Sequence, residues 1–148
     1  MKSYVVVAMG FCVLVAAAAL PSARAQLPGA GPHKYAKYPG TATIVRVEKS
    51  KDNNHGKAAE GYNVWFTFVP KEQVKEENGQ EYLKNHKEHE FTLTNGWHPG
   101  PKYLKKYGIK QGAKMPCTLS VIIQGTTSPI IFELDGVDRA DYFEAAPR

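Results

Sequence analysis

Hydrophobic and polar residues alternate along five short stretches of the chain, and this period of two predicts β-strands. Residues 62–70 show the pattern best, because one face is apolar or aromatic throughout while the other carries Asn63, Trp65 and Thr67. The other predicted strands are residues 41–50, 90–94, 116–125 and 128–136. Each stretch has one apolar face, so we expect a sheet that is covered on one side or closed on itself.

The first of these strands departs from strict alternation. Ile44, Val45 and Val47 cannot all face the same side of a regular strand. A β-bulge would bring them to a common face, and so would strong coiling of the strand. We therefore expect an irregularity within residues 41–50.

Turn-forming residues between the third and fourth strands predict a short helix over residues 101–107. Asn95 and Gly96 end the preceding strand, Pro101 suits the first helical position, and Gly108 suits the left-handed C-terminal position. Leu104 is expected to pack inward, together with Ile109 just after the helix. A second short helix could form on the surface within residues 74–87.

This order of elements, three strands, a helix and two strands over about residues 40–136, resembles the OB-fold. The resemblance implies a mainly β domain, a five-stranded barrel with a short helix between strands three and four. The long connection between strands two and three and the segment after residue 136 depart from the OB pattern. They leave another small β-barrel or an α+β sandwich as alternatives. In OB-folds ligands lie on the outer face of strands two and three, which implies a site formed by Trp65, Asn63, Thr67, Thr92 and Thr94.

The N-terminal residues have the layout of a secretory signal peptide. Lys2 precedes an apolar run over residues 5–20, and Ala23 and Ala25 supply the small residues of a cleavage site. The run is shorter than the roughly 20 residues of a membrane-spanning helix, so no membrane anchor is expected after cleavage. The sequence thus predicts a signal peptide over 1–25, a flexible linker over 26–40, one domain over 41–143 and a tail over 144–148. The mature protein is expected to be periplasmic or secreted.

Cleavage would leave Cys117 as the single cysteine, which excludes a disulfide within one chain. Because Cys117 lies in an apolar alternating run, we expect a buried thiol; the alternative is a disulfide between two chains.

Charge is distributed unevenly along the chain. Without Lys2 and Arg24, 17 of the 19 Lys and Arg residues remain against 14 Asp and Glu, a net charge of +3 that is too small for a dedicated nucleic-acid binder. Residues 97–132 nevertheless contain no acidic residue. Lys102, Lys105 and Lys106 would share one face of the predicted helix, which favours an anionic partner such as an acidic glycan. The alternative is an ordinary solvated helix surface.

Histidines offer a different kind of site. If His86 and His89 lay on one helix face they could share a metal ion, with His98 or His55 completing the set. No nucleophile motif, phosphate-binding glycine loop or HExxH sequence is present. We therefore expect no enzymatic activity and no cofactor.

The sequence as a whole predicts an exported, non-catalytic binding or interaction module. Its expected partner is an anionic ligand or another envelope protein. One alternative is a metal-handling envelope protein that uses His86 and His89. The other is a structural or assembly subunit, which would present an exposed strand edge and self-associate.

Overall fold

The computed structural model describes residues 33–51 and 60–144, which belong to one compact unit. The predicted signal peptide, His55 and residues 145–148 of the predicted tail lie outside the described residues. Within the described ranges, no helix is both long enough and apolar enough to cross a membrane.

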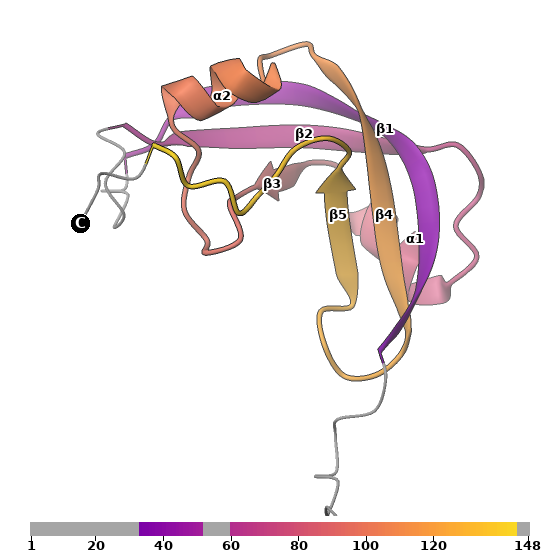
Figure 1. Ribbon diagram of the computed structural model, residues 1–148. Helices are drawn as coiled ribbons and strands as arrows, with labels where there is room; N and C mark the ends of the chain where they lie inside the picture. Colours follow the sequence, from indigo (N-terminus) through magenta and orange to yellow (C-terminus); the bar gives the residue numbers. More distant parts are fainter. Residues whose placement is uncertain (1–32, 52–59, 145–148) are drawn as a thin grey trace, which may run out of the picture. The chain divides into compact units, whose positions relative to one another are not determined.

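Five antiparallel strands form one strongly curled sheet, a half-barrel (Figure 1). Along the sheet the strand order is β3-β2-β1-β4-β5. The strands are β1 (Lys34–Lys49), β2 (Tyr62–Pro70), β3 (His89–Phe91), β4 (Lys114–Gln124) and β5 (Ile130–Leu134). Two helices accompany them, α1 (Glu77–Asn85) between β2 and β3 and α2 (Pro101–Tyr107) between β3 and β4. The predicted fold class, mainly β with five strands and a short helix between the third and fourth, is confirmed, and the arrangement is compatible with an OB-like fold.

The central strand β1 is longer than the sequence predicted. Its first half, from Lys34 to Thr43, pairs with β4, so residues 34–40 belong to the sheet and not to a linker. Prediction failed here because Pro39 and Gly40 suggested a loop. Tyr38 is nevertheless buried, and its hydroxyl donates a hydrogen bond of 2.5 Å to Glu76. The register of β1 against β2 shifts between Ile44 and Arg46, which confirms the expected irregularity as a bulge.

The core lies on the concave side of the curled sheet. It collects the apolar residues that alternate along the strands, and Ile44, Val64, Leu119 and Val121 are fully buried within it. Cys117 is 1% exposed, which confirms the expectation of a buried thiol. Burial raises the pKa of Cys117 to about 12, so the thiol stays protonated at neutral pH.

Helix α2 begins at Pro101 and is followed by Gly108 at φ +65°, as predicted. Its first turn is capped from a distance. The Glu144 carboxylate accepts hydrogen bonds from the backbone N–H groups of Lys102 (2.8 Å) and Tyr103 (2.6 Å). A side chain at Gly100 would collide with that carboxylate. Glu144 therefore belongs to the folded domain, and the predicted domain end at residue 143 was too early.

Candidate functional site

The half-barrel does not close by backbone pairing. β3 and β5 are the two edge strands of the sheet, and their pairings with β2 and β4 make them parallel to each other. We call the space between these two edges the seam. Side chains cross it on the concave side, where the Phe132 ring of β5 lies 4.2 Å from His89 and 5.5 Å from Phe66, measured between ring centroids. In Figure 1, β5 has a paired neighbour on one side, β4.

One end of the seam is tied by the segment that follows β5. This yellow segment passes β3 and continues toward α2 (Figure 1). The Thr94 N–H donates to the Arg139 carbonyl at 3.0 Å, and Arg139 Nε donates to the Thr92 carbonyl at 2.8 Å. These two hydrogen bonds hold the ends of the edge strands together and leave the backbone between them unpaired.

The ladder between β4 and β5 shows which backbone groups face the seam. Asp135 N–H donates to Pro116, and Ile122 N–H donates to the Pro129 carbonyl, both at 2.9 Å. Because hydrogen-bonded pairs alternate along an antiparallel ladder, Ile131 and Glu133 also bond toward β4. Ile130, Phe132 and Leu134 must then direct their N–H and C=O groups into the seam.

The described residues leave most of these groups without a partner. The Leu134 carbonyl accepts from Val137 N–H at 3.1 Å. The N–H and C=O of Ile130 and Phe132, and the N–H of Leu134, have no backbone partner within residues 33–51 and 60–144. The same alternation along β2 and β3 turns the backbone of Glu90 toward the seam from the other side.

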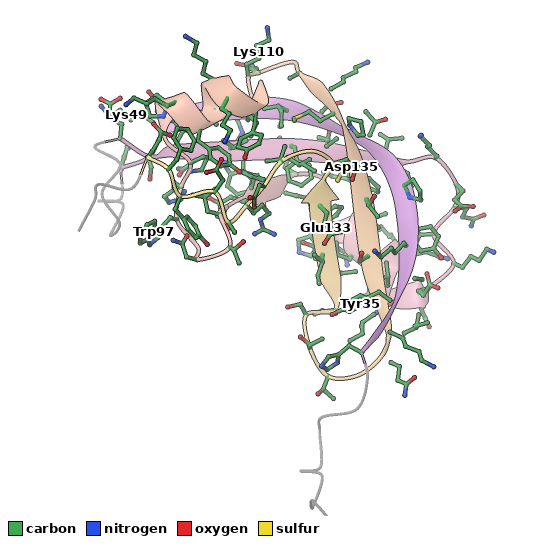
Figure 2. All side chains as sticks on the ribbon, viewed as in Figure 1. Tyr35, Lys49, Trp97, Lys110, Glu133 and Asp135 are labelled. Atoms are coloured by element: carbon green, nitrogen blue, oxygen red, sulfur yellow. The ribbon has the colours of Figure 1, made fainter. Side chains whose placement is uncertain are left out.

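Two hollows border the free edge of β5, one on each face. The inner groove has a volume of about 290 Å³, and its lining combines aromatic and aliphatic side chains with charged and polar ones. The outer groove has a volume of about 330 Å³ and also has a mixed polar and apolar lining. Ile131, Leu134 and Arg139 line both. The inner groove is completed by Phe66, Glu90, Phe91, Ser128, Ile130 and Phe132, and the outer one by Thr94, Glu133, Val137, Asp138 and Ala140. Figure 2 shows Glu133 beside the β5 strand.

The predicted histidine site is arranged differently from the expectation. α1 ends at Asn85, so His86 and His89 do not share a helix face; His86 is the exposed C-cap and His89 is a buried residue of β3. Their rings stack with Tyr82, at centroid distances of 4.3 and 5.6 Å. His98 Nδ1 lies 4.0 Å from Glu90 Oε1. Across the described parts of the chain, no three His, Cys, Asp or Glu side chains gather closely enough to hold a metal ion.

His89 is nonetheless an unusual residue at the seam. It is 5% exposed, and its Nδ1 has no hydrogen-bond partner within the described ranges. Desolvation by burial, with a smaller contribution from His86, lowers the pKa of His89. The neutral imidazole therefore serves as an aromatic packing partner of Phe66 and Phe132.

The face predicted to bind ligand is partly covered by the protein itself. Trp65 points outward as expected, but the Arg46 guanidinium lies 5.0 Å from its ring centroid and is held by Glu88 at 2.7 Å. Asn63 and Thr67 flank Trp65 and are half-buried. The other two predicted residues lie at the seam. The Thr92 carbonyl accepts from Arg139 and Thr94 lines the outer groove.

The lysine face of α2 carries less unpaired positive charge than its sequence suggests. Lys106 is paired with Asp141, which also accepts a hydrogen bond from the Tyr107 hydroxyl at 2.7 Å. The hydrogen bond from Lys106 lowers the pKa of Asp141, so this pair stays ionised at neutral pH. Lys102 and Lys105 are exposed. The acidic residue that pairs with this face comes from the C-terminal segment. That segment lies outside residues 97–132, the range over which the sequence shows no acidic residue.

The two residues that best define the seam, Phe132 and Arg139, are not among the site residues predicted from the sequence. Phe132 lies within the predicted strand 128–136, but the pattern of residues does not show that this strand lies at a free edge of an open sheet. Arg139 is one of two arginines in the predicted domain. Comparison of the chain with protein-family models, with curated proteins and with solved structures finds no match.

Proposed function

We propose that this protein is a non-catalytic interaction module that accepts an extended polypeptide segment of a partner along the free edge of β5. The observation that carries the proposal is the row of unpaired backbone groups on Ile130 and Phe132, with the Leu134 N–H, beside a groove lined in part by aromatic side chains. A row of alternating N–H and C=O groups is complementary to another extended backbone, which is the basis of binding by strand addition. The exposed strand edge also agrees with the assembly alternative expected from the sequence.

The backbone groups alone supply modest affinity. Each net hydrogen bond contributes about 1 kcal/mol, so the free groups of β5 contribute about 5 kcal/mol before the segment loses its conformational freedom. Useful affinity then requires side chains of the segment to enter the inner groove. Residues of a strand alternate between its two faces, so every second residue of the partner would meet Phe66, Phe91 and Phe132.

A partner segment fits this edge better than the β5 strand of a second copy. Antiparallel pairing of two β5 strands centred on Phe132 would place Glu133 opposite the Ile131 side chain of the other copy, twice in the dimer. Neither pair gains a charge partner or apolar contact. A partner segment with a different sequence can place other residues opposite Ile131 and Glu133 and so avoid this mismatch.

Matched variants at Ile130 test the proposal. Ile130→Pro removes the N–H that faces the seam, while the ladder to β4 does not use that N–H. Ile130→Ala removes the same side chain and keeps the N–H. The probes are short peptides of alternating valine and threonine with both ends blocked, and binding is followed by fluorescence polarisation. We expect Ile130→Pro to bind at least about fivefold more weakly than Ile130→Ala, the factor for one lost hydrogen bond.

Equal affinity of the two variants, or no binding of any alternating peptide to the unaltered protein, would contradict strand addition. A dimer of the unaltered protein that dissociates in Ile130→Pro but not in Ile130→Ala would instead identify a second copy as the occupant. Sedimentation velocity measured on the same samples separates these outcomes.

A further inference from the structure

We infer that the bound segment carries a carboxylate that pairs with Arg139 at the tied end of the seam. This inference rests on the proposed function and adds the chemical class of the segment. It also specifies apolar side chains on the face of the segment that enters the inner groove.

Arg139 is held in place with part of its hydrogen-bonding capacity unused. Its Nε donates to the Thr92 carbonyl, and its guanidinium carbon lies 5.9 Å from the centroid of the Phe91 ring. These contacts orient the guanidinium plane. Its two terminal nitrogens make no hydrogen bond or ion pair within the described ranges. The side chain therefore remains available for the bidentate pairing that guanidinium groups form with carboxylates.

The position of Arg139 also suits a ligand. Arg139 is partly buried and lines both the inner and the outer groove. A group bound on either face of the β5 edge would therefore lie near its guanidinium. A partly buried cation has lost some of its hydrogen bonds to water, and this costs free energy. A carboxylate bound to the guanidinium would replace those hydrogen bonds. Charge-assisted bidentate hydrogen bonds are about twice as strong as neutral ones, whereas an ion pair on an open surface contributes little.

Other charged side chains limit how acidic the segment can be. Glu90 lines the inner groove, and Glu133 and Asp138 line the outer one. None of these carboxylates lies within 4.0 Å of the Arg139 guanidinium, so they leave it unpaired but repel additional negative charge. The grooves thus favour a segment with a single carboxylate near Arg139 over a polyanion.

The place of Arg139 beyond the end of β5 fixes where that carboxylate must be. A segment antiparallel to β5 would bring the side chain of an Asp or Glu at its first docked residue to Arg139. A segment parallel to β5 would bring its last docked residue there, and its own C-terminal carboxylate could then serve. The chemistry is shared, and peptides with defined ends distinguish the two sources.

The test uses four alternating valine–threonine peptides and the purified full chain. The first peptide begins with Glu, the second begins with Gln, and both have blocked ends. The third ends in a free carboxylate and the fourth in an amide. For one of the two pairs, we expect the carboxylate peptide to bind about tenfold more tightly than its neutral match, the range for a charge-assisted hydrogen bond.

Arg139→Gln should abolish that preference, so that the carboxylate peptide and its neutral match bind this variant with equal affinity. Arg139→Lys retains the charge without the bidentate geometry and should keep part of the preference, which preserves the test if Arg139→Gln does not fold. Equal binding of charged and neutral peptides to the unaltered protein would overturn the inference while strand addition still stands. A preference that persists in folded Arg139→Gln would also overturn it. Absence of all peptide binding would overturn both proposals together.

Discussion

Replacement of Phe132 by alanine tests whether side chains crossing the seam maintain the curl of the sheet. The Phe132 ring lies 4.2 Å from His89, 5.5 Å from Phe66 and 5.3 Å from Phe68, measured between centroids. A fully buried Phe→Ala change costs about 3–5 kcal/mol, of which each favourable ring pair contributes about 0.5–1.5 kcal/mol. Phe132 is partly exposed to the inner groove. We therefore expect a loss of about 2–3 kcal/mol in the free energy of unfolding.

The matched control is Ile131→Ala, on the opposite face of the same strand. Ile131 makes the same ladder with β4 but no ring contact across the seam, and its replacement should cost about 1 kcal/mol or less. Urea denaturation followed by fluorescence and by circular dichroism gives both free energies. A Phe132→Ala cost no greater than that of Ile131→Ala would refute the view that this ring holds β5 to the other edge.

Three further predictions follow from individual residues. Glu144→Gln should reduce stability by about 1 kcal/mol through weaker capping of α2, measured by urea denaturation against the surface control Glu72→Gln; no difference from the control would remove the capping role. The pKa of His89 is lowered in the folded protein. The contribution of neutral His89 to folding stability is therefore complete above its unfolded-state pKa of 6.5, and it is lost as the pH falls through its folded-state pKa. The melting temperature should then fall less on acidification in His89→Phe than in the unaltered protein, and parallel curves would contradict this assignment. Cys117 should react with a maleimide reagent only as fast as the domain unfolds, whereas rapid labelling in native buffer would show that the thiol is accessible.

Much of the fold could be predicted because it depends on local pattern. Alternation identified the strands, Pro101 and Gly108 bounded α2, and the crowding of Ile44, Val45 and Val47 indicated the bulge. The error over residues 34–40 has a physical cause. Those residues have weak strand propensity, and long-range pairing with β4 together with burial of Tyr38 overrides it.

The candidate site was less predictable because it depends on how distant segments meet. Whether β3 pairs with β5 depends on the curl of the whole sheet. No short stretch of sequence determines that curl. The predicted lysine face lost part of its charge because Asp141 folds back onto Lys106. Likewise, Arg46 covers the Trp65 ring from the neighbouring strand. Local patterns identified Trp65 and Lys106 but not the side chains that cover or pair with them.

Amide hydrogen exchange of β5, resolved by NMR, tests the central claim most directly. In the free protein, the amides of Ile131 and Glu133 bond toward β4 and should exchange slowly, whereas those of Ile130 and Phe132 face the seam and should exchange fast. Addition of an alternating valine–threonine peptide should slow exchange at Ile130 and Phe132 and leave the other two little changed. Equal protection of all four amides in the free protein, or no change at Ile130 and Phe132 when the peptide is bound, would contradict binding by strand addition.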